Sequence, residues 1–141
     1  MVQKIPRIGI GVFIFKNGEF VMGRRKGSHG EGSWSVPGGH LEFGETIEEG
    51  AKREAKEEAG VNITNIRIAG VTNDIFETEG KHYITIWVTS QWKSGKPTVM
   101  EPNKYVKVGW YNFGSLPKNL FLPWKQLLKS NFFSDIKKLS Q

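Results

Sequence analysis

The stretch from Gly38 to Val61 constrains the fold of this chain more than any other, because it joins a glycine-broken loop to a helix with clear ends. Thr46 is a favourable N-cap, and Glu49 three residues later completes the Thr-x-x-Glu pattern of a capping box. Gly60 is typical of the residue that ends a helix in the left-handed conformation. The sequence therefore predicts a helix from Ile47 to Ala59.

This predicted helix places carboxylates beside its apolar face. At about 100° per residue, one narrow apolar arc contains Ile47, Ala51, Ala55 and Ala59. Glu54 and Glu58 fall at the edge of the arc or within it, and Glu57 extends the acidic stripe. Carboxylates that cluster next to an apolar surface repel each other and lose hydration, so they need a fixed partner. A divalent cation such as Mg²⁺ is one such partner; the alternative is a solvated helix face rich in charge pairs.

The spacing of charged residues and glycines across the stretch resembles the signature box of the Nudix hydrolases. These enzymes use a divalent metal to cleave nucleoside diphosphates linked to another group. The matching positions are Gly39, Glu45, Arg53, Glu54, Glu57, Glu58, Gly60 and Val61. Ala55 departs from the pattern, since the family usually has a bulkier aliphatic residue there.

The resemblance also implies roles for these residues. It implies Mg²⁺ as the cofactor, with Mn²⁺ as a substitute, and the implied ligands are Glu54, Glu57, Glu58 and the carbonyl of Gly38. It further implies that Glu45 and Arg53 fix the loop against the helix and orient the glutamates, because a ligand carboxylate works only when its rotamer is held.

Composition and hydrophobic pattern predict a single α/β domain over residues 1–141. The chain is 38% hydrophobic, which is enough for a core, and it has no cysteine for disulfides, thiolate metal sites or nucleophilic attack. No stretch approaches the length of a membrane span and no leader pattern is present, so we expect a cytoplasmic protein without a membrane partner. The architecture we predict is an α/β/α sandwich with a mixed sheet between helices, and the resemblance implies the same fold.

Apolar runs and turn residues predict the other elements. The expected strands cover residues 8–15, 19–24, 63–74, 83–89 and 105–110. Asn17-Gly18 predicts a hairpin turn between the first two, and Glu79-Gly80 lies where the next two are joined. Pro123 favours the first turn of a second helix, which we expect at residues 124–129, and a helical tail follows.

Three further segments resemble the nucleotide triphosphate diphosphatase branch of the family, namely residues 23–28, 37–45 and 82–86. The resemblance covers about residues 8–129 and leaves 130–141 as a tail. It implies a base pocket at the loop before the last helix, where Phe121, Leu122 and Trp124 would bind substrate. Pro123 replaces a glycine of that branch, and core packing is the alternative role for each aromatic residue.

Two other subfamilies lack their usual markers in this chain. Enzymes that act on ADP-ribose usually have a proline some fifteen residues past the box, where this chain has Asp74-Ile75-Phe76-Glu77. Dinucleoside polyphosphate hydrolases usually have a tyrosine just beyond, where this chain has Thr78-Glu79. Both absences favour the triphosphate branch.

Together these features predict Mg²⁺-dependent hydrolysis of nucleoside triphosphates, oxidised or modified purine nucleotides included, to the monophosphate and pyrophosphate. Arg25, with Arg24 or Lys26 as alternatives, is expected to hold phosphates that the metal does not. The candidate catalytic residues are Glu45, Arg53, Glu54, Glu57 and Glu101, of which Glu57 or Glu101 would accept the proton.

Other functions stay open at this point. One alternative is a different nucleoside diphosphate-linked substrate such as a nucleotide sugar, and another is a non-catalytic module that binds nucleotide or nucleic acid. The net charge of +6 suits any polyanion, although the intact glutamate set favours an enzyme over a binder of nucleic acid. A homodimer is also compatible, because this fold is often dimeric.

Overall fold

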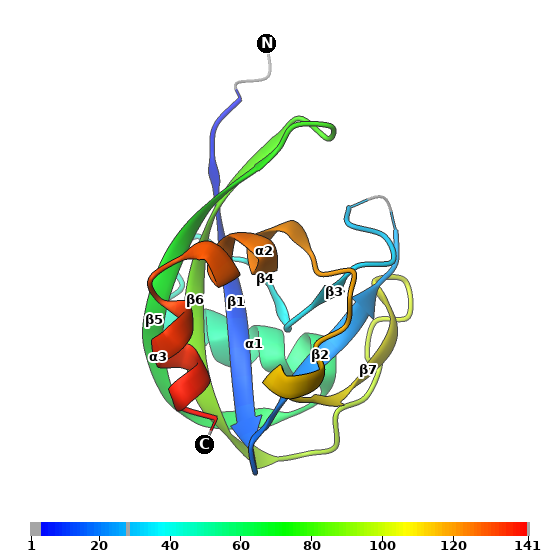
Figure 1. The fold of residues 1–141 in the computed structure, drawn as a ribbon, viewed down its shortest axis with the longest axis vertical. Coiled ribbons are helices and arrows are strands. Elements are labelled where there is room, and N and C mark those ends of the chain that lie inside the picture. The colour runs from blue at the N-terminus through cyan, green and yellow to red at the C-terminus, as the bar shows by residue number, and fades with distance from the viewer. Residues whose placement is uncertain (1–3, 28, 141) are drawn as a thin grey trace.

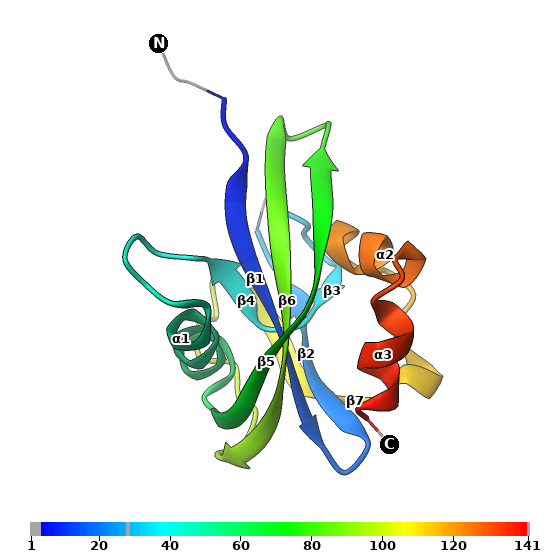
Figure 2. The same ribbon diagram turned by 90° about the vertical axis from the view of Figure 1, so that its left-hand side faces the viewer.

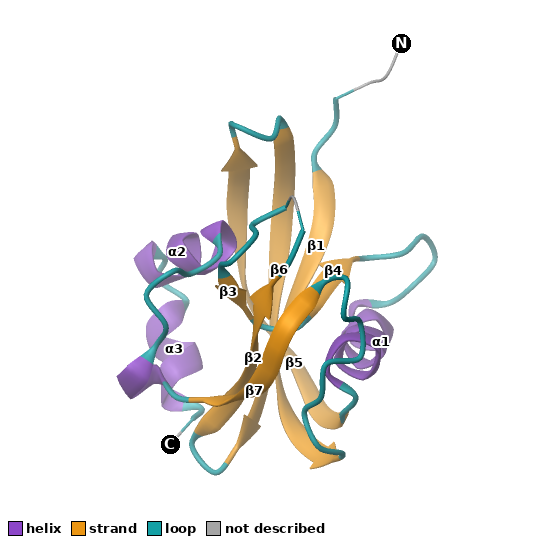
Figure 3. Ribbon diagram, turned by 90° about the vertical axis from the view of Figure 1, so that its right-hand side faces the viewer, coloured by secondary structure: helices purple, strands orange, loops and turns teal. Residues whose placement is uncertain are grey.

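The computed structural model describes residues 4–27 and 29–140, and it confirms the predicted sandwich of a mixed sheet between helices (Figures 1 and 2). The elements in chain order are β1 (Arg7–Lys16), β2 (Glu19–Arg25), β3 (Trp34–Ser35), β4 (Gly38–His40), α1 (Ile47–Ala59), β5 (Asn62–Phe76), β6 (Lys81–Ser94), β7 (Tyr105–Tyr111), a 3₁₀ turn (Phe113–Ser115), α2 (Leu122–Lys129) and α3 (Phe133–Lys138). Helix α1 covers one face of the sheet, and α2 and α3 cover the other (Figure 3).

The sheet has the strand order β3-β2-β1-β6-β5, while β4 pairs with β1 and β7 pairs with β2. Strands β1 and β2 form the expected hairpin, in which Asn17 and Gly18 both have positive φ angles, of 50° and 80°. Strands β1 and β6 run parallel, with Arg7 opposite Tyr83, whereas the other pairs are antiparallel. Strand β6 therefore lies between β1 and β5, although it follows both in the chain.

Helix α1 has the boundaries that its caps predict. The Thr46 hydroxyl accepts a hydrogen bond from the Glu49 amide at 3.1 Å, and the Glu49 carboxylate accepts one from the Thr46 amide at 3.2 Å. Gly60 ends the helix with a φ of 70°. The alanines of α1 are fully buried against β1 and β5 in the first core, which contains Ile10, Val12, Ile14, Val21, Ala51, Ala55, Ala59, Val61, Ile63 and Val88. Small side chains thus let the acidic helix lie close to the sheet.

The second core, on the opposite face, is built mainly from aromatic residues. It contains Phe13, Phe15, Phe20, Met22, Val36, Trp87, Leu120, Trp124, Leu127 and Ile136. The second predicted helix is confirmed as α2, with Pro123 in its first turn, and the helical tail as α3. Within residues 4–27 and 29–140, no helix is both long and apolar enough to cross a membrane.

Candidate active site

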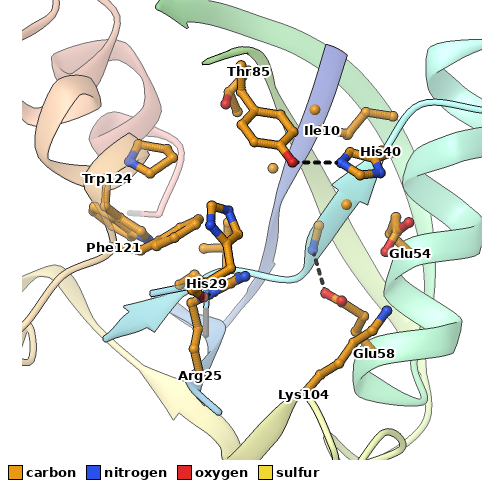
Figure 4. A pocket seen from close by; sticks show the side chains of 18 of the residues that line it. Ile10, Arg25, His29, His40, Glu54, Glu58, Thr85, Lys104, Phe121 and Trp124 are labelled. Carbon is orange, nitrogen blue, oxygen red and sulfur yellow. Dashed lines mark hydrogen bonds between the residues drawn. The ribbon is translucent and has the colours of Figure 1, made fainter. Parts of the chain in front are cut away.

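A cavity of about 620 Å³ opens between α1, β4, the loop after β2 and the start of α2 (Figure 4). Its volume lies within the range of about 300–1,000 Å³ that is typical of small-molecule pockets. Glu54 and Glu58 stand on one side of the cavity, opposite Phe121 and Trp124 (Figure 4). The cavity therefore has an acidic end, formed by α1, and an aromatic end near α2.

Two glycines bring the backbone of β4 against the acidic helix. A Cβ atom at Gly38 would lie 2.1 Å from the carbonyl oxygen of Ile10, and one at Gly39 would lie 2.6 Å from Oε1 of Glu54. No side chain could be accommodated at either position without moving backbone or a carboxylate. The glycines of the sequence motif are thus required by the close approach of β4 to β1 and α1.

Glu58 is buried and held by two donors. Its side chain lies on α1 with a residue exposure of 5%, and its Oε1 accepts hydrogen bonds from the Gly38 amide at 2.7 Å and the Tyr105 hydroxyl at 3.1 Å. The pKa of Glu58 is raised to about 7, mainly by burial and also by the charge of Glu54, against the opposing effect of the Gly38 hydrogen bond. A carboxylate in this position is fixed in orientation but poorly compensated in charge.

Arg53 connects the remaining acidic residues of the box. Its guanidinium forms a bidentate ion pair with Glu45, with distances of 2.6 and 2.9 Å, so the expected contact between these two residues is present. The same group donates to Glu54 at 2.6 Å, to Glu57 at 3.2 Å and to the carbonyl of His40 at 3.0 Å. The hydrogen bond from Arg53 lowers the pKa of Glu45 to about 2. Arg53 therefore ties the loop before α1 to two of the glutamates that line the cavity.

The donor set of the acidic end fits a divalent cation, although it is not closed into a metal cage. In the described part of the chain, no cluster of three or more His, Cys, Asp or Glu side chains has metal-site geometry. Glu54, Glu57 and Glu58 nevertheless all line the cavity. Burial raises the pKa of both Glu54 and Glu58, and a neighbouring carboxylate adds to the effect, Glu57 at Glu54 and Glu54 at Glu58. Oxygen ligands with excess negative charge are what Mg²⁺ and Mn²⁺ bind, so these residues fit such an ion.

The structure brings some of the predicted substrate-binding residues into the cavity and leaves others out. Arg25 and Phe121 line it, with the guanidinium carbon 3.9 Å from the ring centroid. Among the described residues that line the cavity, neither Arg24 nor Leu122 is present. Arg24 is exposed, because alternate residues of β2 point to opposite faces of the sheet. The structure thus does not place Arg24 and Leu122 together with Arg25 and Phe121.

Trp124 and Glu101 also differ from their expected positions. Trp124 borders the cavity but is 0% exposed, and its ring packs against Phe13 and Phe20 with centroid distances of 5.2 and 5.9 Å. It belongs to the aromatic core, which was the alternative role for this residue. Glu101 lies outside the described cavity lining and pairs with Lys104 at 3.5 Å, whereas Lys104 itself lines the cavity.

Sequence reasoning missed much of the aromatic end. The His29 ring lies 4.6 Å from Phe76, 5.7 Å from Tyr83 and 5.2 Å from Phe121, measured between centroids. His29 comes from the loop after β2 and also pairs with Glu79 of the β5–β6 turn at 2.5 Å. The alternation of β6 could have placed Tyr83 on the cavity face, but His29 sits in a glycine-rich loop whose path has no sequence signal.

Comparison with known proteins agrees with this geometry. The family model described as NUDIX domain matches residues 5–131. The chain belongs to the Nudix family. Among solved structures, this Nudix domain is similar to a MutT NUDIX hydrolase from Burkholderia pseudomallei, with a TM-score of 0.78 and 30% identity over 83% of this chain and 91% of that one. The family and fold that the sequence motif implied are thereby confirmed.

Curated relatives of this Nudix domain match over shorter stretches. It is 37% identical over 59 residues to the oxidized purine nucleoside triphosphate hydrolase of Mus musculus, which covers 42% of this chain and 38% of that protein. It is 30% identical over 90 residues to the low-salt glycan biosynthesis protein Agl8 of Haloferax volcanii, which covers 60% of this chain and 58% of the relative. The matched part of the chain thus spans between about two fifths and three fifths of the length of these relatives.

Proposed function

We propose that this Nudix domain is a pyrophosphohydrolase that cleaves nucleoside triphosphates to the monophosphate and pyrophosphate. The observation that carries the proposal is the cavity itself, in which buried carboxylates of α1 face aromatic rings at the opposite end. Such a site suits a ligand with a polyphosphate at one end and a flat base at the other. The similarity to an oxidized purine nucleoside triphosphate hydrolase supports purine nucleotides, modified ones included, as the substrate class.

The acidic end would hold Mg²⁺, with Mn²⁺ as a substitute, through Glu54, Glu57, Glu58 and the carbonyl of Gly38. When bound, a divalent ion supplies charge neutralisation for phosphate oxygens and lowers the pKa of water. Arg53 orients Glu54 and Glu57 through its hydrogen bonds of 2.6 and 3.2 Å. Gly38 and Tyr105 orient Glu58 in the same way.

The other charged residues of the cavity bind phosphate and move a proton. Arg25 and Lys104 line the cavity and can donate to phosphate oxygens. Glu57, whose side chain is 51% exposed, is the most accessible carboxylate of the three, so we assign it to the proton of the attacking water. Glu101 does not reach the cavity lining and is not needed for this step.

Substitution of Glu58 tests the proposal. We expect Glu58→Gln to lower kcat for nucleoside triphosphates by about a hundredfold or more, because the buried ligand position loses its charge. Pyrophosphate release with and without Mg²⁺ measures the effect, and Mn²⁺ binding followed by electron paramagnetic resonance should weaken in parallel. Glu48→Gln, on the exposed side of α1, is the matched control. Wild-type activity in Glu58→Gln would contradict the assignment.

A substrate panel tests the specificity. We expect at least one nucleoside triphosphate to have a higher kcat/KM than ADP-ribose, because the segment around Phe76 lacks the proline of the ADP-ribose enzymes. The panel should contain the common and the oxidised purine triphosphates, ADP-ribose and a nucleotide sugar. A kcat/KM for ADP-ribose or the nucleotide sugar above that of every triphosphate would overturn the proposed substrate class.

A further inference from the structure

A buried chain of hydrogen bonds runs beneath the aromatic end of the cavity, and the mechanism above does not use it. The Trp87 Nε1 group donates to the Thr72 hydroxyl at 2.9 Å, and the Thr72 hydroxyl donates to Oδ2 of Asp74 at 3.2 Å. The Thr85 hydroxyl donates to the same Oδ2 at 2.5 Å. Asp74 is 0% exposed, and its Oδ1 has no hydrogen-bond partner among the described residues.

The chemistry of these groups fixes the direction of every bond in the chain. An indole N–H can only donate, so Thr72 accepts from Trp87 and uses its own proton toward Asp74. An ionised carboxylate can only accept, so the Thr85 proton also points toward Asp74. Thr85 is therefore left with lone pairs and no proton for any other partner. Its remaining hydrogen-bonding capacity is that of an acceptor.

Thr85 is the member of this chain that combines a polar group with access to the aromatic end. Thr85 lines the cavity (Figure 4). On β6 it stands two residues from Tyr83 and therefore on the same face of the strand. On the neighbouring strand β1 its partner is Gly9, where a Cβ would lie 3.8 Å from the Thr85 hydroxyl oxygen. Thr85 itself is buried, with an exposure of 7%, and the missing side chain at Gly9 leaves room beside its hydroxyl oxygen on the side of the cavity.

We propose that Thr85 reads the edge of the bound nucleobase as a hydrogen-bond acceptor, and that Asp74 is the positioning residue that sets this polarity. The inference rests on the proposed function for the identity of the ligand as a nucleotide. A base that carries an N–H group against Thr85 completes the chain of bonds. A base without one leaves the Thr85 oxygen desolvated and unpaired.

Matched nucleotides that differ by one amino group test the reading of the base. Binding is titrated at pH 8 without metal, using adenosine against purine riboside 5′-monophosphate and guanosine against inosine 5′-monophosphate. In at least one pair, wild-type protein should bind the amino form about threefold to tenfold more tightly. Thr85→Val should bring that ratio within twofold, whereas Thr85→Ser should keep it. Equal binding within both pairs by wild type, or an unchanged ratio in Thr85→Val, would overturn the proposal.

Substitution of Asp74 tests the positioning role separately. Asp74→Ala frees the Thr85 hydroxyl to turn and donate, so the ratio for the discriminated pair should fall to within twofold. Asp74→Asn retains a carbonyl acceptor for both hydroxyls and should restore the wild-type ratio. Retention of the ratio in folded Asp74→Ala, or its loss in Asp74→Asn, would contradict the role. If Asp74→Ala does not fold, the binding ratios of Thr85→Val, Thr85→Ser and Asp74→Asn still test the proposal.

The two proposals fail independently. Binding of monophosphates requires neither metal nor turnover, whereas pyrophosphate release from triphosphates requires both. Hydrolysis without discrimination at Thr85 would contradict the base-reading role alone. Discrimination without hydrolysis would contradict the proposed function alone.

Discussion

Arg53 is the side chain on which the order of the acidic end depends most. One guanidinium contacts Glu45 on the loop, Glu54 and Glu57 on the helix, and the carbonyl of His40 on β4. A planar group with five donors can satisfy so many acceptors at once, whereas a lysine has three donors and no fixed plane. Loss of any one acceptor should therefore loosen the packing of both the loop before α1 and the helix itself.

Glu45→Gln should remove stability that depends on pH. The pKa of Glu45 is about 2 in the folded protein, against an ordinary value of 4.5 for glutamate, so the ion pair stabilises the fold fully above pH 4.5 and loses its effect as pH falls toward 2. Because the pair lies near solvent, we expect a loss of about 1 kcal/mol at pH 7.

Urea denaturation between pH 2 and 7 measures this effect. The difference in free energy of unfolding between wild type and Glu45→Gln should shrink to near zero at the acid end. Glu48→Gln, which removes only an exposed contact with Lys52, is the control. A difference that stays constant down to pH 2 would show that charge at Glu45 is not the cause.

Single residues were predictable where their roles are local in sequence. The placement of Glu54, Glu57 and Glu58 follows from one helix, and Arg53 follows from its position on the same helix. Tyr105 was missed, because its hydrogen bond to Glu58 joins residues 47 positions apart and no short motif encodes that contact. Arg24 was assigned to the site because the sequence does not show which of two adjacent arginines faces the cavity.

At the level of elements, the accuracy of prediction follows the range of the interactions that define each one. Helix α1 was predicted to the residue, since Thr46, Glu49 and Gly60 lie within it or next to it. Strands β5 and β6 extend beyond their predicted ends, because their long antiparallel pairing continues past the alternating pattern and includes residues of weak strand propensity such as Asn62 and Lys81. The division of residues 34–40 into β3 and β4 depends on two different partner strands, β2 and β1, and could not be read locally.

The N-cap of α1 should contribute measurable stability. Thr46→Ala removes the side-chain acceptor of the Glu49 amide and should reduce the free energy of unfolding by about 1 kcal/mol. Thermal or urea denaturation measures the change, with Thr78→Ala in the exposed β5–β6 turn as the control. Because the helix positions the glutamates, KM for Mg²⁺ should rise as well. Equal stability of Thr46→Ala and Thr78→Ala would show that the cap is not important.

In the molecule as a whole, two cores on opposite faces of one sheet serve different ends of the cavity. The first core packs against α1, which bears the carboxylates of the acidic end. The second core packs against α2 and includes Trp87, whose indole donates to Thr72 in the hydrogen-bond chain that ends at Asp74. Local sequence patterns predicted α1 and α2, but they could not decide between the base pocket and the core for Trp124. Its neighbours Phe13 and Phe20 lie more than a hundred residues earlier in the chain.

Trp124→Ala should therefore act on stability. Because the indole is fully buried among aromatic rings, its removal should reduce the free energy of unfolding by about 3–5 kcal/mol. The fall in free energy of unfolding is measured by urea denaturation, and Phe121→Ala, at the half-buried ring that lines the cavity, is the comparison. Phe121→Ala should instead raise KM for triphosphates. A raised KM with unchanged stability in Trp124→Ala would assign that residue to the base pocket after all.

The parallel pairing of β1 with β6 also affects how the protein is made. Arg7 finds its partner Tyr83 only after the helix, β5 and the start of β6 have left the ribosome, although the β1–β2 hairpin can form from adjacent residues. Contacts between such distant segments carry a loop-closure cost before they stabilise anything, so we expect refolding in milliseconds to seconds rather than microseconds. During synthesis, the edge of β1 that pairs with β6 stays unpaired until β6 emerges, and early termination within β6 leaves a chain that has α1 but no completed sheet against which it can pack.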